Sequence, residues 1–189
     1  MGTRNDDYKD VSFVKLFTEI SPEDVFEKYN LFALVEKDFY AVTAGKSGNY
    51  NSMIGSGGGF GLFFKKPTTW NLFRTDRYTL ELIRKEQTYT LSYFPDEYKK
   101  QVLFLASKSG RDSKKMKEVK LRTIRTPSGN ISFKEANLII ECQLTAITTP
   151  LPTDFYSQES KSYIDEVYKD ANDYRKLVFG EITHLWESR

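Results

Sequence analysis

Apolar and polar residues alternate with a two-residue period along much of this chain, and this pattern predicts β-strands. The clearest case is residues 88–94, where alternation coincides with residues of high β-propensity. The same pattern predicts strands within residues 32–50, above all 39–43, and at 60–64, 68–73, 137–148 and 176–186. Turn residues at 45–51, and Lys65-Lys-Pro67, separate neighbouring strands.

Short helices are predicted between these strands. Ser21-Pro-Glu-Asp24 supplies an N-cap serine, a proline at the first helical position and acids in the first turn, so a helix should follow through Tyr29. Further helices are expected at residues 78–85, 96–106, 114–119 and 160–169. Many closely spaced strands with small helices favour a closed antiparallel barrel, because a doubly wound parallel sheet needs a crossover helix between successive strands.

Composition restricts the class of protein further. A chain of 189 residues suits a single domain over 1–189, with residues 1–10 expected to be flexible. The formal net charge of +2 is too small to imply nucleic acid or an acidic membrane surface, and no apolar run is long enough to span a membrane. The basic run Lys114, Lys115, Lys117 and Lys120, broken by Glu118, is expected to be a solvated helix face. The 15% aromatic content suits strands, ring ligands or a subunit interface.

Cysteine and histidine are too rare for several kinds of site. Cys142 is the only cysteine, so no intrachain disulfide can form, and the strand pattern around it indicates a buried thiol. His184 is the only histidine, which excludes zinc sites built on several histidines, and a structural or surface role is expected for it. No metal site is predicted. A reducing, cytoplasmic compartment is the natural interpretation.

Two segments carry candidate chemistry. The run from Asn51 to Phe60 contains four glycines and two serines, so bare amides there can approach a ligand closely. Arg74 and Arg77 lie three residues apart at the start of a predicted helix, a natural setting for an anion. Together the segments indicate a phosphate-bearing cofactor along a sheet edge. Taken separately, each fits a simpler explanation, a tight turn in one case and a solvated helix end in the other.

The order of short motifs points to a family. The motifs are Asn51-x-Met53, Gly58-Gly-Phe-Gly61, Lys66-Pro67, Arg74-x-x-Arg77-Tyr-Thr79, Thr90-Leu-Ser-Tyr-Phe94, Ser109-Gly-Arg-Asp112 with Lys115 nearby, Pro127-Ser-Gly129, Glu135-Ala-x-Leu138, Glu141-Cys142 and Gly180-Glu-Ile182. In this order and spacing, over residues 30 to 187, the chain resembles the flavin reductase-like proteins with the FMN-binding split-barrel fold.

The resemblance implies a mainly β fold, a Greek-key split barrel with short peripheral helices. It further implies a homodimer that binds FMN noncovalently near the subunit interface, with NAD(P)H as a possible electron donor and no nucleic-acid or membrane partner. The expected activity is that of an FMN-binding oxidoreductase passing a hydride from NAD(P)H to flavin and on to an acceptor that the sequence does not identify. No catalytic side chain is required by hydride transfer itself.

The resemblance also assigns cofactor-binding residues in three groups. The flavin ring would lie against Asn51, Ser52, Met53, Ile54, Gly55, Ser56 and Gly57; the phosphate would be held by Arg74, Arg77, Tyr78 and Thr79; and the loop with Ser107, Ser109, Gly110, Arg111 and Lys114 would contribute to the same phosphate site. That loop can equally be a helix N-cap, with Asp112 or Ser113 as the capping residue.

Two positions depart from the family pattern. Gly57 stands where tryptophan is frequent, and Arg175 stands where histidine is common. Loss of the indole would open a pocket beside the flavin, unless Trp70 or Phe60 fills the space or the backbone requires glycine. Both departures leave open a noncatalytic FMN-binding electron carrier, or a barrel that has lost flavin and binds other molecules.

Overall fold

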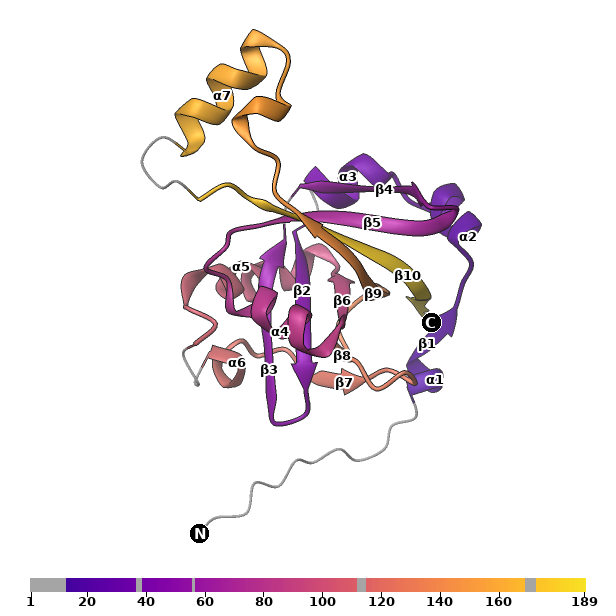
Figure 1. Cartoon of the computed structure of the whole chain (residues 1–189). Coiled ribbons are helices and arrows are strands. Elements are labelled where there is room, and N and C mark those ends of the chain that lie inside the picture. Colours follow the sequence, from indigo (N-terminus) through magenta and orange to yellow (C-terminus); the bar gives the residue numbers. More distant parts are fainter. Residues whose placement is uncertain (1–12, 37–38, 56, 112–114, 169–172) are drawn as a thin grey trace.

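The computed structural model describes residues 13–36, 39–55, 57–111, 115–168 and 173–189 (Figure 1). Residues 1–10, for which flexibility is predicted, lie outside these ranges. The predicted site residues Ser56 and Lys114 also lie outside them.

The strands of the described chain are all paired antiparallel. They are β1 (Phe17–Glu19), β2 (Tyr40–Lys46), β3 (Asn49–Gly55), β4 (Gly58–Phe63), β5 (Lys66–Phe73), β6 (Thr88–Tyr93), β7 (Thr123–Arg125), β8 (Ile131–Phe133), β9 (Leu138–Thr148) and β10 (Lys176–Ser188).

Eight strands form one sheet in the order β3-β2-β6-β9-β10-β5-β4, with β1 added beside β10, while β7 and β8 form a separate hairpin. The long strand β10 pairs with β9, β5 and β1, and its register against β9 shifts after Phe179 and again after Ile182. Such bulges bend a strand and help a sheet to curl. The strands β3 and β4 stand at the two edges of this sheet, and they do not pair with each other among the described residues. The expected mainly β, antiparallel architecture is thus confirmed.

Short helices surround the sheet (Figure 1). They are α1 (Phe13–Leu16), α2 (Pro22–Lys28), α3 (Leu31–Glu36), α4 (Tyr78–Glu86), α5 (Lys99–Ser107), α6 (Lys115–Glu118) and α7 (Gln158–Tyr168), with 3-10 turns η1 (Asp96–Tyr98) and η2 (Pro152–Asp154). None of the helices in the described chain is long and apolar enough to cross a membrane.

The sequence pattern located α2 correctly. Ser21 caps the helix through a reciprocal pair of hydrogen bonds with Asp24, and Pro22 occupies the first turn. The predicted strand character of residues 32–36 is wrong, because α3 lies there. The Oδ1 atom of Asn30 accepts hydrogen bonds from the amides of Phe32 and Ala33, both at 3.1 Å, so Asn30 begins a helix that the apolar run concealed.

The expected turn at residues 45–51 is also too long. The chain reverses near Gly48, which has a φ of +85°, and Asn49 already begins β3. Residues 49–55 then pair with all of β2, from Tyr40 opposite Gly55 to Lys46 opposite Asn49. Most of the glycine-rich run of residues 51–60 is therefore strand, and the side chains of β3 point alternately to the two faces of the sheet.

The core fills the inner face of the curled sheet. Tyr40, Tyr89 and Tyr93 are among its largest buried side chains, and they pack with Leu91 and Ile140. Cys142 is part of this cluster and 1% exposed, as expected for a structural thiol. Burial raises the pKa of its thiol, which keeps the sulfur protonated and unreactive.

A buried carboxylate fixes the turn after β7. Glu141 is fully buried and accepts hydrogen bonds from Thr126 Oγ1 at 2.8 Å, Asn130 Nδ2 at 2.6 Å and Trp186 Nε1 at 2.7 Å. Its carboxylate is thus satisfied by neutral donors. His184 stacks on Trp186 with ring centroids 5.9 Å apart, which supports a structural role for it.

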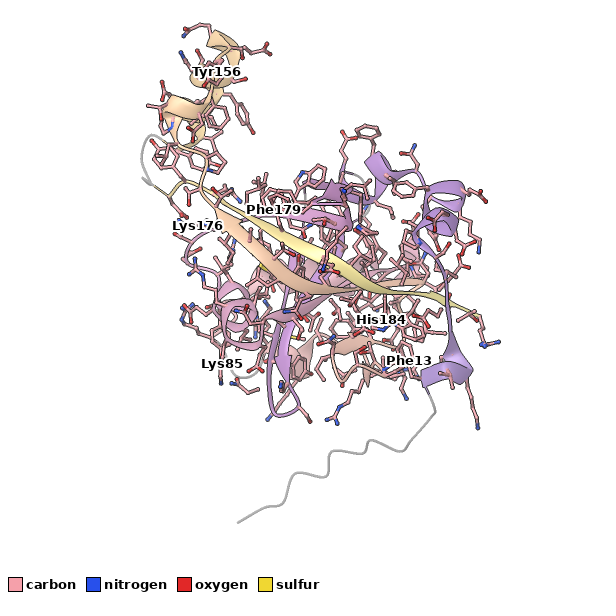
Figure 2. The ribbon with its side chains drawn as sticks, turned by 45° about the vertical axis from the view of Figure 1, so that its right-hand side comes forward. Phe13, Lys85, Tyr156, Lys176, Phe179 and His184 are labelled. Carbon is pink, nitrogen blue, oxygen red and sulfur yellow. The ribbon has the colours of Figure 1, made fainter. Side chains whose placement is uncertain are left out.

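Between β9 and β10 the chain leaves the body of the molecule and returns as an arm. We use "the arm" for residues 149–168, which include η2 and α7, and Figures 1 and 2 show it projecting beyond the sheet. Neither η2 nor α7 has a buried residue. Tyr156 in the arm is 91% exposed.

Candidate functional site

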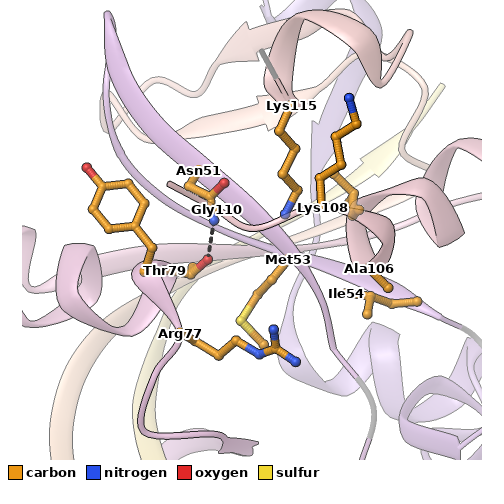
Figure 3. Close-up of a pocket in the computed structure, with 11 residues that line it drawn as sticks. Asn51, Met53, Ile54, Arg77, Thr79, Ala106, Lys108, Gly110 and Lys115 are labelled. Carbon is orange, nitrogen blue, oxygen red and sulfur yellow. Dashed lines mark hydrogen bonds between the residues drawn. The ribbon is translucent and has the colours of Figure 1, made fainter. Parts of the chain in front are cut away.

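A polar pocket lies where β3 meets α4, α5 and α6 (Figure 3). Its enclosed part measures about 40 Å³, which suits a group of a few heavy atoms. The pocket is lined by Asn51, Met53, Ile54, Arg77, Tyr78, Thr79, Leu105, Ala106, Lys108, Gly110 and Lys115. The structure thus brings together members of all three predicted groups, from β3, from the start of α4 and from the loop after α5.

Asn51 presents an unpartnered acceptor at this pocket. The side chain is 2% exposed, and its Nδ2 donates a hydrogen bond of 2.7 Å to Thr79 Oγ1. Its Oδ1 atom has no hydrogen-bond partner among the described residues. Gly110 lies directly against this amide, because a Cβ at position 110 would stand 2.5 Å from Asn51 Nδ2. A buried polar atom without a partner is costly, so Oδ1 is suited to accept from a ligand.

Lys115 supplies a buried positive charge. The side chain is 2% exposed, and Nζ donates a 2.8 Å hydrogen bond to the carbonyl oxygen of Ser52 in β3. Burial, with a smaller contribution from the nearby charge of Arg77, lowers the pKa of Lys115 to about 8. The expectation that the basic run forms a solvated helix face is therefore wrong for Lys115, which turns inward because α6 packs its first residue against β3.

The arginines near the pocket differ in their partners. Arg74 forms ion pairs with Asp76 at 3.3 Å and Asp173 at 3.6 Å. Arg111 pairs with Glu81 and donates to the Asp76 carbonyl oxygen at 3.1 Å.

Neither Arg77 nor Lys115 forms an ion pair with a carboxylate among the described residues. Arg77 is also the N-cap of α4, where no side chain caps the helix. The pocket is therefore a site of unneutralised positive charge at a helix N-terminus, which favours an anion.

Other predicted residues lie around the pocket with structural partners. The Ser52 hydroxyl shares a buried 2.6 Å hydrogen bond with Thr43, so only the Ser52 carbonyl faces Lys115. The Tyr78 hydroxyl donates to Asn49 Oδ1 at 3.1 Å. Ser107 donates to the Phe104 carbonyl oxygen at 2.8 Å, within its own helix.

Ser109 accepts from the amide of Arg111 at 3.2 Å, which shapes the loop that carries Gly110. Gly55 packs where a Cβ would overlap the ring of Tyr40. Neither Ser109 nor Gly55 is among the residues that line the pocket.

Gly57 is explained by its backbone. Its φ is +74°, a conformation that side chains disfavour, and its amide donates to the Val35 carbonyl oxygen at 2.7 Å. Tyr40 Oη donates to the carbonyl oxygen of Gly57 at 3.1 Å. Trp70 packs instead over Gly59, so it does not fill the space beside Gly57. Of the explanations considered for this glycine, the structure supports the backbone requirement.

Arg175, the second departure, belongs to the charge cluster that includes Arg74. Both cations lower the pKa of Asp173, after the larger effect of its hydrogen bonds from Thr75. Arg175 is not among the residues that line the polar pocket.

Sequence reasoning did not assign Lys115, Lys108, Leu105 or Ala106 to the site. For Lys115, the available signal was its place after the Ser109-Gly-Arg-Asp112 motif. Lys108 pairs with Glu118, so its charge is neutralised. In the described part of the chain, His, Cys, Asp and Glu side chains form no group suited to a metal ion.

Comparison with known proteins gives the class. The profile of the family described as "Flavin reductase like domain" matches residues 60–189, so the chain belongs to this family. No curated protein matches the sequence.

Among solved structures, an FMN-binding domain of a flavin reductase-like enzyme from Shewanella baltica is similar, with a TM-score of 0.64 and 13% identity over 90% of this chain and 76% of that one. An FMN-binding protein from Thermus thermophilus with bound p-hydroxybenzaldehyde has a TM-score of 0.60 and 17% identity, over 79% and 71% of the two chains. An NADH:FAD oxidoreductase from Streptomyces globisporus has a TM-score of 0.56 and 13% identity, over 89% of each chain. At these identities the likeness establishes a shared fold.

Proposed function

We propose that this protein is an FMN-binding flavoprotein oxidoreductase. The observation that carries the proposal is the pocket of Figure 3, where the unneutralised cations Arg77 and Lys115 lie beside the unpartnered Oδ1 atom of Asn51. Such a site calls for a ligand that has both an anionic group and a hydrogen-bond donor. FMN has both, in its phosphate and in its ring and ribityl groups.

The residues present fit this cofactor. Arg77, at the N-terminus of α4, has the charge and the fork of donors that suit a phosphate. Gly110, which has no side chain, lies against the Asn51 amide, and β3 contributes Met53 and Ile54 to the lining of the pocket. The enclosed cavity is smaller than a whole flavin, so most of the cofactor would lie on the open side of the pocket.

Bound FMN would supply the redox chemistry, taking a hydride from NAD(P)H and passing electrons to an acceptor. The chain's part is to bind and orient. Arg77 and Lys115 stabilise negative charge, and Asn51 holds a donor group in place. No side-chain acid or base is needed in this scheme.

A noncatalytic FMN-binding electron carrier is the second candidate. The position where histidine is common in relatives holds Arg175, a guanidinium that, like Arg74, lowers the pKa of Asp173 and offers no acceptor nitrogen. If that histidine assists hydride transfer in relatives, this chain lacks the assistance and could still carry electrons.

The proposal includes a homodimer and a reducing, cytoplasmic location. A cofactor that extends beyond the enclosed pocket would be covered by a second subunit, which supports dimerisation. The buried, unpaired Cys142 supports a reducing compartment.

Anaerobic mixing of the FMN-loaded protein with NADH or NADPH separates the two candidates. Loss of the oxidised flavin absorbance on the time scale of turnover supports the oxidoreductase. Flavin that stays oxidised, but is reduced when a separate reductase is added, supports the carrier. Protein that binds no flavin contradicts both.

A further inference from the structure

Arg77 follows a short turn, residues 74–76, that its own contacts hold only weakly. The hydrogen bond that closes the turn runs from the Arg77 amide to the Arg74 carbonyl oxygen and is long, at 3.3 Å. Arg77 is the N-cap of α4 and has donors only, so its side chain cannot accept from the first amides of the helix. The geometry of the turn therefore depends on contacts from more distant parts of the chain.

Asp173, just before β10, supplies such a contact. Its Oδ1 atom accepts hydrogen bonds from the Thr75 amide, at 3.1 Å, and from the Thr75 hydroxyl. Its Oδ2 atom lies 3.6 Å from Arg74 Nε, and the Asp173 side chain is 16% exposed. The hydrogen bonds from Thr75 lower the pKa of Asp173, so at neutral pH it is a carboxylate, which accepts more strongly than a neutral oxygen does.

Arg111 contacts the same turn from the loop after α5. Its Nη1 atom donates a 3.1 Å hydrogen bond to the Asp76 carbonyl oxygen, and its guanidinium carbon lies 5.5 Å from the centre of the Tyr78 ring. The turn is thus held between the segment before β10 and the loop after α5, and Arg77 at its end lines the pocket (Figure 3). These contacts stand in for the side-chain cap that α4 lacks.

Asp173 also neutralises the arginine of the turn that does not line the pocket. It shares Arg74 with Asp76, whose carboxylate lies 3.3 Å from Arg74 Nη2. Arg77 forms no ion pair with a carboxylate of the described chain. Asp173 itself is not among the residues that line the pocket. A carboxylate outside the pocket thus holds the backbone of the turn and leaves Arg77 as the cation that is available to a ligand.

We infer that Asp173 is a positioning residue for binding of the cofactor phosphate, because its contacts with Thr75 hold the turn that presents Arg77 to the pocket. A binding side chain is precise only when the groups behind it fix its place, and Asp173 has this part for Arg77. The inference rests on the FMN binding of the proposed function. It adds a residue that neither the sequence motifs nor the lining of the pocket marks.

Titration with FMN and with riboflavin, at about 0.15 M salt to screen exposed charges beyond about 8 Å, tests the inference. Asp173→Asn keeps an oxygen that can accept from Thr75, whereas Asp173→Ala removes it, and both variants remove the same charge from Arg74. The alanine variant should bind FMN about fivefold more weakly than the asparagine variant, with riboflavin affinities that agree within about twofold. The matched control is Asp154→Ala, which removes a carboxylate that accepts from the Leu151 amide at 2.7 Å in the arm, and it should bind FMN as the wild type does.

A double-mutant cycle gives a sharper readout. In an Arg77→Ala background, the difference between Asp173→Ala and Asp173→Asn should fall below about twofold, because a residue that acts through Arg77 then has nothing to position. Thr75→Val removes the hydroxyl donor from the other side of the contact, and it should weaken FMN binding about threefold in the presence of Arg77 only. Circular dichroism verifies that each variant is folded, and Thr75→Val tests the same contact if Asp173→Ala does not fold.

Equal FMN affinities of Asp173→Ala and Asp173→Asn overturn the inference and leave FMN binding by the wild type standing. Tighter binding by the alanine variant, a difference that persists without Arg77, or an equal loss of riboflavin affinity also overturns the inference alone. A wild-type protein that binds no FMN contradicts the proposed function, and the inference falls with it. Loss of FMN affinity that depends on Arg77 and spares riboflavin supports both.

Discussion

At the scale of single residues, the candidate site is defined by which charges lack a partner. Arg74 and Arg77 look equivalent in the sequence, yet Asp76 and Asp173 pair with Arg74. Arg77 has no such ion pair among the described residues and lines the pocket. A charge that is already neutralised gains less from a ligand anion, so the two arginines should contribute unequally.

Arg77→Ala should lower FMN affinity by about one to two decades, because one charge-assisted contact contributes roughly 1.5–3 kcal/mol. Arg74→Ala is the matched control and should have the smaller effect. Titration with FMN and with riboflavin, which lacks the phosphate, measures both variants. An equal loss of affinity for the two ligands in Arg77→Ala would show that the arginine does not act on the phosphate.

The pH dependence of binding should report on Lys115. Its pKa is about 8 in the folded protein and 10.5 ordinarily, so between these values the unfolded chain holds a proton that the folded chain has released. The stability of the ligand-free protein should therefore rise with pH through this window. Anion binding favours the protonated amine, and hence FMN affinity should fall as pH rises above 8.

FMN titration between pH 7 and 9.5 tests this linkage, since a phosphate with a second pKa of about 6 is a dianion throughout that range. Lys115→Met is the comparison and should bind more weakly at pH 7 with a flatter profile. A wild-type profile that matches that of Lys115→Met would remove Lys115 from the site.

Lys115 also shows what the sequence could not reveal at this scale. In a run of basic residues, every lysine resembles a solvated one, because composition does not record which helix face packs on a strand. Only the contact of α6 with β3 brings the Lys115 amine to the Ser52 carbonyl oxygen. Asn51 and Arg77, by contrast, could be selected by residue type, spacing and family resemblance.

At the scale of elements, local signals located most helices and strands correctly. The capping residues of α2 and the alternation of β6 are examples. The error at α3 came from an apolar run, Leu31 to Val35, that suits either a buried strand or a helix. The Asn30 cap was the signal that decided it.

The turn between β3 and β4 depends on a glycine for its backbone. Gly57→Ala should destabilise the protein by about 1 kcal/mol, since a side chain at a left-handed position is strained. Gly48→Ala is the control, because Gly48 has a φ of +85° and open space around its Cβ position. Urea unfolding should show similar losses for both variants, with wild-type FMN affinity in Gly48→Ala. Unchanged stability in Gly57→Ala would refute the backbone explanation.

At the scale of the whole molecule, the antiparallel sheet brings distant segments into one pocket. β3, the start of α4 and the loop after α5 are separated along the chain, yet Asn51 contacts Thr79 and lies against Gly110. The mainly β class could be predicted from alternation and turn residues. The order of strands and the free arm could not, since both depend on long-range packing that no local pattern encodes.

The central claim is that the pocket of β3, α4 and α6 binds FMN through its unneutralised cations. The most direct measurement is an FMN titration, monitored by flavin fluorescence, of the wild-type protein and of a variant that combines Arg77→Ala with Lys115→Met. We expect one FMN per chain in the wild-type protein and an affinity lower by about two decades or more in the folded double variant. Equal affinities in the two proteins, or a wild-type chain that does not bind FMN, would contradict the claim.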